Sequence, residues 1–288
     1  MITPDDIQTS ATARMRWVGS GAGADCAPGG FALVNDPSRP LVVDSWLMDD
    51  GRVRAWPAHL ARFSSACARM TGLPAARCVA FMVASVRQLP ATGRWFPRVE
   101  LVMIDDRPRL QLWPRPAPAR GEAVRLWISP TADQRVQPTV KGADLGYLAE
   151  LRQAAVRAGA DETLLLSADG RVREGTTTSV LWWRGKTLCL PPDTPHLLPG
   201  VTCAAILGLA ATRGVRVQEE ESRPRDLAGL EVWAVNALHG IRPVRGWVGA
   251  SIDAGPSRRE RRWNTLLRDQ AIPPSECGTA AEAPVNRR

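Results

Sequence analysis

The chain has 288 residues, 44% hydrophobic and 23% charged, a globular composition long enough for two domains. No run of 18 apolar residues occurs and the N-terminus holds Asp5 and Asp6 without an apolar block, so we expect a cytoplasmic protein with neither a transmembrane helix nor a secretory signal. The net charge is +8, but the arginines are dispersed, which favours a solvated arginine-rich surface over a nucleic-acid interface. Six scattered cysteines without a Cys-x-x-Cys pair, with only three histidines, predict buried thiols and no metal site.

The first part of the chain predicts a lead-in followed by a small domain. Residues 1–30 are rich in small residues and predict a flexible lead-in, and 31–115 predict a small N-terminal α/β domain. The spacing of apolar residues in the small domain predicts a strand over 41–48, helices over 58–72 and 79–89, and a hairpin of 98–104 with 109–113.

Three prolines in the five residues from Pro114 to Pro118 predict a stiff connector, and we place the domain boundary there. A larger α+β domain is expected over 119–250. Beyond it, 255–288 are polar and rich in proline and alanine, which predicts a disordered tail. The large domain should hold strands near 123–128, 162–167, 178–183, 215–219, 231–236 and 244, and helices over 144–158 and 201–214.

Lysine is unusually rare in this chain. Of 37 lysines and arginines, only Lys141 and Lys186 are lysine. A guanidinium stays protonated and forms no imine, whereas a lysine amine can lose its proton and attack a carbonyl. Lys186 follows Arg184-Gly185, which indicates an exposed hairpin turn and explains this lysine by solvent exposure. Lys141 has no such explanation and is therefore the candidate for a chemical role.

Five short segments occur in an order that resembles a known family. They are His59-Leu60-Ala61-Arg62-Phe63, Lys141, Asp161-Glu162 through Glu174-Gly175-Thr176, Leu198-Pro199-Gly200-Val201-Thr202, and Asn236 through Val244. This order is similar to class IV enzymes that depend on pyridoxal 5′-phosphate (PLP): branched-chain aminotransferases, D-amino acid aminotransferases and aminodeoxychorismate lyases. The resemblance covers about 40–246 and implies the class IV fold, with a smaller α/β domain, a larger domain with a barrel-like sheet, and a homodimer whose site lies between domains.

The resemblance also implies roles for individual residues. Lys141 is the Schiff-base lysine, and Glu174 is the acid beside the pyridine nitrogen, because a protonated ring is a better electron sink. Arg62 binds the phosphate together with Val201 and Thr202, which begin a helix whose free N–H groups attract anions. Tyr147 is a candidate for contact with the PLP hydroxyl. Weaker candidates for substrate contact are His239 and Ser45.

Each residue has a simpler interpretation as well. Glu174 is also compatible with a surface turn, Arg62 with a solvated helix face, and Thr202 with a plain helix N-cap. Tyr147 and His239 are compatible with packing alone.

Departures from the family pattern guide the choice of reaction. The short Asp105-Asp106-Arg107-Pro108 turn replaces a loop that helps to bind the substrate carboxylate in D-amino acid aminotransferases. The run Asn236-Ala237-Leu238 is similar to aminodeoxychorismate lyases. We therefore expect lyase chemistry that releases pyruvate and gives 4-aminobenzoate. Alternatives are an amino-acid transaminase with a 2-oxo acid acceptor and, more remotely, a non-catalytic PLP-fold binding protein.

Overall fold

The computed structural model describes residues 13–19, 30–34 and 38–279. The chain forms two compact units. Unit 1 comprises 1–119, 141–143 and 270–288, and unit 2 comprises 120–140 and 144–269. The change of unit at residues 119 and 120 lies beside the proline-rich connector. The sequence did not suggest that Lys141 and the C-terminal residues belong to the first unit. Most of the lead-in, 1–12 and 20–29, lies outside the described residues.

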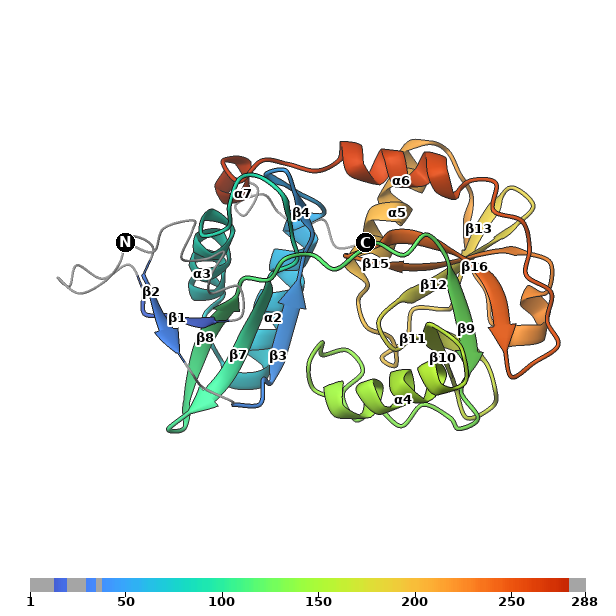
Figure 1. The fold of residues 1–288 in the computed structure, drawn as a ribbon, viewed down its shortest axis with the longest axis horizontal. Helices are drawn as coiled ribbons and strands as arrows, with labels where there is room; N and C mark the ends of the chain where they lie inside the picture. Colours follow the sequence, from blue (N-terminus) through green and yellow to red (C-terminus); the bar gives the residue numbers. More distant parts are fainter. Residues whose placement is uncertain (1–12, 20–29, 35–37, 280–288) are drawn as a thin grey trace. The chain divides into compact units, whose positions relative to one another are not determined.

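Unit 1 is built on a five-stranded antiparallel sheet in the order β2-β1-β8-β7-β3. The hairpin of β7 and β8 turns at Asp105 and Asp106, which both adopt positive φ, a conformation that aspartate tolerates well. Helices α2 and α3 pack against this sheet (Figure 1). The elements are β1 (Arg14–Trp17), β2 (Phe31–Val34), β3 (Val42–Ser45), α2 (Trp56–Thr71), α3 (Ala75–Arg87), β7 (Arg98–Ile104) and β8 (Arg107–Trp113), with short strands β4 (Met48–Asp49), β5 (Arg52–Val53) and β6 (Arg94–Trp95).

Helix α2 positions two of the motif residues. It begins near Pro57, whose fixed φ suits a first helical turn, and it ends at Gly72, which adopts the left-handed conformation and donates its N–H to the Ala68 carbonyl. The apolar face predicted from the sequence is buried, with Phe63 and Cys67 fully covered. His59 belongs to this buried face, while Arg62 lies at its margin.

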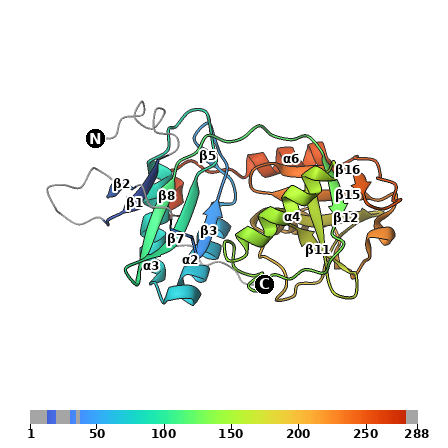
Figure 2. The same cartoon turned by 60° about the horizontal axis from the view of Figure 1, so that its bottom comes forward.

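Unit 2 is built on a curled eight-stranded sheet in the order β11-β10-β9-β16-β15-β12-β13-β14. Helices α4, α5 and α6 pack against β10, β15 and β16, respectively. Figure 2 labels α4 and α6 together with β15 and β16. Two apolar clusters fill the interior, one around Trp182 and one around Trp233. The elements are β9 (Val124–Ile128), α4 (Leu145–Arg157), β10 (Glu162–Leu166), β11 (Val172–Gly175), β12 (Ser179–Arg184), β13 (Thr187–Leu190), α5 (Val201–Thr212), β14 (Val217–Glu219), the 3-10 helix η1 (Pro224–Leu227), β15 (Glu231–Asn236), β16 (Gly240–Val248) and α6 (Glu260–Asp269).

The expectation of a disordered tail fails over the described part of 255–288. Helix α6 buries Trp263 and Leu267 against the sheet of unit 2. Ile272 then pairs with Val53, and helix α7 (Glu276–Thr279) brings the Cys277 carbonyl to the Trp56 indole N–H at 2.9 Å. Composition misled the prediction because a few apolar side chains, spaced for one helix face, outweigh the polar average.

No helix among the described residues is long and apolar enough to cross a membrane. Within the same residues, no group of three or more histidine, cysteine, aspartate or glutamate side chains is arranged to hold a metal ion.

Candidate active site

Lys141 is held against the edge strand of the unit 1 sheet. Its carbonyl accepts a 2.7 Å hydrogen bond from the Val43 N–H, so its backbone is fixed to β3. Gly142 follows with φ of +122°, and a Cβ there would lie 2.9 Å from the Val43 nitrogen. Only glycine allows this approach of chain to strand, and the approach places the half-buried Lys141 beside β3.

A buried carboxylate in β3 binds both motif residues of α2. Asp44 is fully buried, and its Oδ1 accepts hydrogen bonds of 2.8 Å from His59 Nδ1 and from Arg62 Nη2. Its Oδ2 accepts the Arg62 Nε–H at 2.8 Å, so the guanidinium is held by two parallel bonds. The Ser45 N–H donates a further 2.7 Å bond to Oδ1. The alternative of a solvated Arg62 on the helix face is therefore wrong, because Asp44 holds its guanidinium.

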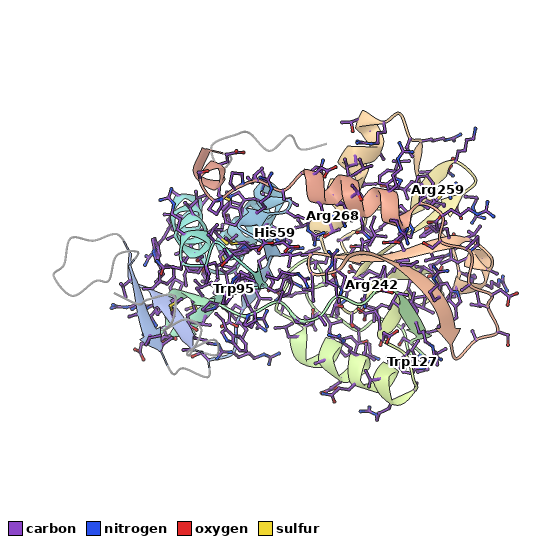
Figure 3. All side chains as sticks on the ribbon, turned by 45° about the horizontal axis from the view of Figure 1, so that its top comes forward. His59, Trp95, Trp127, Arg242, Arg259 and Arg268 are labelled. Carbon is purple, nitrogen blue, oxygen red and sulfur yellow. The ribbon has the colours of Figure 1, made fainter. Side chains whose placement is uncertain are left out.

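The pKa values of Asp44 and His59 in this cluster are both lowered, for different reasons. Burial alone would raise the pKa of Asp44, but Arg62 and His59 lower it far below its ordinary value. Burial lowers the pKa of His59, Asp44 opposes this, and the positive charges of Arg62 and Lys141 lower it further. His59, labelled in Figure 3, is therefore a neutral imidazole whose Nδ1–H donates to Asp44. Because Lys141 lowers the pKa of His59, its charge is close enough to interact with the cluster of Asp44, His59 and Arg62.

Glu174 lies at the end of β11 and is 5% exposed. Its Oε1 accepts hydrogen bonds from Arg135 Nη1 at 2.7 Å and from the Leu198 N–H at 2.8 Å. Among the described residues, none donates a hydrogen bond to Oε2. Burial raises the pKa of Glu174, and the Arg135 charge and the Leu198 N–H oppose that rise. The alternative of a surface turn is wrong for Glu174, because the carboxylate is buried and fixed at one oxygen.

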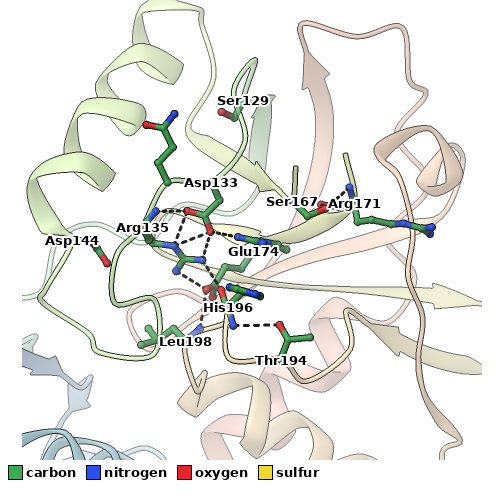
Figure 4. A network of polar contacts seen from close by, with 12 residues as sticks. Ser129, Asp133, Arg135, Asp144, Ser167, Arg171, Glu174, Thr194, His196 and Leu198 are labelled. Atoms are coloured by element: carbon green, nitrogen blue, oxygen red, sulfur yellow. Dashed lines mark hydrogen bonds and ion pairs between the residues drawn. The ribbon is translucent and has the colours of Figure 1, made fainter. Parts of the chain in front are cut away.

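Arg135 is itself held by a second buried carboxylate. Asp133 accepts bonds from Arg135 Nη2 at 2.7 Å and Nε at 3.1 Å through Oδ2, and Arg173 Nη1 contacts the same oxygen at 3.1 Å (Figure 4). Arg135 also donates to the His196 carbonyl at 2.9 Å. Burial lowers the pKa of Arg135, but Asp133 and Glu174 raise it overall, so the guanidinium stays charged. The network fixes the side chain of Glu174 from one side.

A third buried carboxylate, Glu162, holds the turn that follows Glu174. It accepts the N–H groups of Thr176 at 3.0 Å and Thr177 at 3.1 Å, and both threonine hydroxyls. A Cβ at Gly175 would collide with the Thr178 hydroxyl, so the turn needs glycine there. The strand end that carries Glu174 is thus fixed by a neighbouring strand, β10.

Helix α5 begins with its N–H groups unoccupied by any side chain. Gly200 is the N-cap residue, no side chain caps the helix, and the first turn holds no acidic residue. Thr202 is therefore not the N-cap residue; it lies buried in the first turn beside Val201. A Cβ at Gly200 would collide with the Ser179 hydroxyl, which the glycine allows to approach. The helix end combines a positive dipole with a compact backbone, the features that bind an anion.

Each of the three remaining candidates makes a polar contact of its own. Tyr147 accepts the Gln134 N–H at its hydroxyl, at 3.2 Å, and so packs on the segment that precedes Lys141. His239 accepts the Gly121 N–H at Nδ1, at 3.2 Å. Ser45 is buried, and Arg115 Nη2 lies 3.5 Å from its hydroxyl.

Sequence reasoning missed Asp44, Arg135 and Glu162 as partners of the motif residues. Asp44 stands alone in an apolar strand, where an acidic residue is a signal that it has a buried partner, whereas Glu162 begins its strand beside Asp161 and gives a weaker signal. Arg135 gives no such signal, because it is one arginine in a loop of a chain rich in arginine.

The chain is similar to several proteins of known name. It is 32% identical to the branched-chain-amino-acid aminotransferase of Escherichia coli strain K12 over 121 residues, which is 41% of this chain and 39% of that protein. The matched region therefore spans less than half the length of this curated relative.

Solved structures share the fold over most of the chain. The 4-amino-4-deoxychorismate lyase of Pseudomonas aeruginosa has a TM-score of 0.70 and 25% identity, covering 84% of this chain and 97% of that one. The branched-chain amino acid aminotransferase of Thermobaculum terrenum, solved in its PLP form, has a TM-score of 0.69 and 17% identity, covering 81% of this chain and 89% of that one.

A family model decides the wider assignment. The model for amino-transferase class IV matches residues 41–247, which include Arg62, Lys141, Glu174 and the start of α5. The match extends over more than two thirds of the chain. The chain therefore belongs to the amino-transferase class IV family, a family of enzymes whose cofactor is PLP.

Proposed function

We propose that this protein is a PLP-dependent class IV enzyme that acts on a small-molecule amino substrate, with aminodeoxychorismate lyase-like chemistry as the leading reaction. The observation that carries the proposal is Glu174. Its Oε1 is held by Arg135 and Leu198, while Oε2 accepts no hydrogen bond from the described residues. A buried carboxylate with one oxygen fixed and the other available suits a protonated pyridine nitrogen.

The other residues fit the remaining parts of the cofactor. Lys141 supplies the amine, and its backbone is fixed to β3. The first turn of α5, with Val201 and Thr202, offers N–H groups for the phosphate, and Arg62 offers a guanidinium whose direction Asp44 sets. Tyr147 is the proposed partner of the PLP hydroxyl, and His239 and Ser45 are proposed substrate contacts. A cytoplasmic homodimer belongs to the same proposal.

Bound PLP supplies an electron sink for carbanion chemistry. The protein's own residues would then hold and transfer protons. Glu174 Oε2 would face the pyridine nitrogen and favour its protonated form, because a neighbouring carboxylate favours a positive charge. Lys141 Nζ would be the base that removes a proton from the substrate and later returns one. In the lyase reaction the loss of that proton lets pyruvate leave and 4-aminobenzoate form.

A transaminase is the second candidate, and the curated branched-chain relative favours it. The lyase is favoured by Asn236-Ala237-Leu238, by the short turn at Asp105-Asp106, and by the likeness to the Pseudomonas aeruginosa lyase. Both reactions use Lys141 and Glu174 alike, so the assay must follow products.

The two chemistries are separated by two parallel assays on the purified enzyme. With aminodeoxychorismate we expect pyruvate and 4-aminobenzoate in equal amounts and no lasting change of the cofactor spectrum. With a panel of amino acids and no 2-oxo acid we expect little of the pyridoxamine form. Accumulation of the pyridoxamine form with a common amino acid, and no 4-aminobenzoate, would identify a transaminase instead.

Replacement of Glu174 tests the cofactor arrangement. We expect Glu174→Gln to retain PLP but to lower turnover about ten- to a hundredfold, since one charge-assisted bond is worth about 1.5–3 kcal/mol. The pH at which the bound cofactor changes its visible absorbance should shift as well. Glu150→Gln, on an exposed position of α4, is the matched control and should leave both readouts unchanged. Full turnover in Glu174→Gln would show that the carboxylate has only a structural role.

A further inference from the structure

Two cysteines of unit 1 meet across the pair of helices α2 and α3. These helices pack against each other, and only residues 72–74 join them. Cys67 lies near the end of α2 and Cys78 near the start of α3, so each is about one helical turn from the link. Both side chains are fully buried, and the Cys67 thiol is hydrogen-bonded to the Cys78 sulfur.

The two thiols differ in acidity. The hydrogen bond with Cys78 raises the pKa of the Cys67 thiol, and burial and the charge of Asp44 raise it further. For Cys78 the same hydrogen bond lowers the pKa, burial opposes this, and the charge of Arg77 lowers it again. Cys78 also lies close to the N-terminus of α3, where the helix dipole favours a thiolate. Cys78 is therefore the thiol that ionises first, and Cys67 is the second thiol beside it.

The first turn of α3, which leads to Cys78, has little to hold it in place. No side chain caps this helix end, and no acidic residue stands in its first turn. Residues 74–77 are exposed. A helix end of this kind opens locally at a lower cost than the whole domain. Such an opening admits a molecule as small as hydrogen peroxide to the Cys78 sulfur.

Cys67 is also linked to the residues that hold Arg62. It lies on the buried face of α2 together with His59, and its pKa responds to the charge of Asp44. Asp44 in turn fixes the Arg62 guanidinium by two hydrogen bonds of 2.8 Å. A covalent bond from Cys67 to α3 would change how α2 packs on β3, and with it the direction in which Arg62 is held.

We propose that Cys67 and Cys78 form a peroxide-sensitive dithiol, and that its oxidation to a disulfide weakens the retention of PLP. The Cys78 thiolate attacks one peroxide oxygen, which breaks the O–O bond, leaves a sulfenic acid on Cys78 and releases the other oxygen as water. The Cys67 sulfur then attacks the sulfenic sulfur, which forms the S–S bond and releases a second water. The dithiol thus loses two electrons and two protons, and the peroxide is reduced to two waters.

Peptide mass spectrometry tests the disulfide. Native enzyme is treated with hydrogen peroxide, unfolded and alkylated with iodoacetamide, and we expect a linked pair of Cys67 and Cys78 that dithiothreitol separates. Cys189→Ala is the matched control, because Cys189 is equally buried but its thiol donates to the Thr187 carbonyl at 3.9 Å. This variant should form the same link. Alkylation of both Cys67 and Cys78 after peroxide, or a link to a different cysteine, would overturn the proposal.

Release of PLP after dilution measures the consequence. Oxidised enzyme should retain PLP at least about tenfold more weakly than reduced enzyme, because one charge-assisted contact is worth about ten- to a hundredfold in affinity. Cys67→Ala lacks the second thiol, so peroxide should not change its retention of PLP. Equal retention by the oxidised and reduced native enzyme contradicts the proposed effect. Both measurements on native enzyme remain decisive if Cys67→Ala fails to fold.

The effect on PLP rests on the proposed function, whereas the disulfide does not. Reduced enzyme that binds no PLP refutes the proposed function, whatever the cysteines do. Reduced enzyme that binds PLP but forms no link between Cys67 and Cys78 refutes the dithiol alone.

Discussion

Lys141→Arg is expected to lower turnover by more than about a thousandfold while the protein stays folded. The guanidinium retains the positive charge near His59 but neither captures the cofactor carbonyl nor acts as a base near neutral pH. General acid–base catalysis alone contributes about 10²–10⁴-fold, and covalent attachment is lost as well. Borohydride reduction followed by peptide mass spectrometry should place the cofactor on Lys141 in the native enzyme and find no label in the variant.

Lys186→Arg provides a matched control, because Lys186 is exposed in the turn between β12 and β13. This variant should keep its colour, its label on Lys141 and its turnover. Label on Lys186 in the native enzyme, or ordinary turnover in Lys141→Arg, would refute the assignment of the lysine.

Asp44→Asn is expected to cost about 3–5 kcal/mol of unfolding free energy at pH 7, the usual loss when one partner of a buried ion pair is removed. Arg62 and His59 both bind this carboxylate, so the variant leaves a buried guanidinium without its anion. Because Asp44 directs the proposed phosphate ligand, the variant should also release PLP more readily. Urea unfolding and cofactor release after dilution measure the two effects.

The pH dependence of that loss has a definite sign. In the folded protein the pKa of Asp44 is far below its ordinary value of 3.8. The contribution of the ionised carboxylate to stability is therefore complete above pH 3.8 and declines as the pH falls below that value. The stability gap between native enzyme and Asp44→Asn should narrow by about 1.4 kcal/mol per pH unit below pH 4. Asp106→Asn, at an exposed turn, should show no gap. A gap that stays constant from pH 7 to pH 3 would mean that the ionised carboxylate is not its source.

The sequence predicted those parts of the fold that have strong local signals. Helix α2 was found from its apolar spacing, and the β7–β8 hairpin from its Asp-Asp turn. Strands β11 and β13 were missed as separate strands. Each has only four residues and directly follows a turn, so the segment was interpreted as part of that turn. Helix α6 was missed because its apolar residues are few, although they lie on one face.

The sequence identified the reactive residues of the candidate site but not the residues that hold them in place. Lys141 was found because lysine is rare here, and Glu174 and Arg62 because their motifs occur in a family order. The residues that hold them come from distant parts of the chain: Arg135 is 39 positions from Glu174, and Asp44 is 18 from Arg62. Such pairings depend on how strands and helices pack, which periodicity in one segment does not reveal.

The discontinuity of unit 1 has a consequence for the order in which the protein forms during synthesis. Its first 119 residues are made early, but Trp56 meets the Cys277 carbonyl 221 positions later, and Val53 pairs with Ile272. At about 5–20 residues per second, the ribosome needs roughly 10–40 s to deliver those partners. Unit 2 is therefore fully synthesised before unit 1 can close, although unit 1 begins the chain.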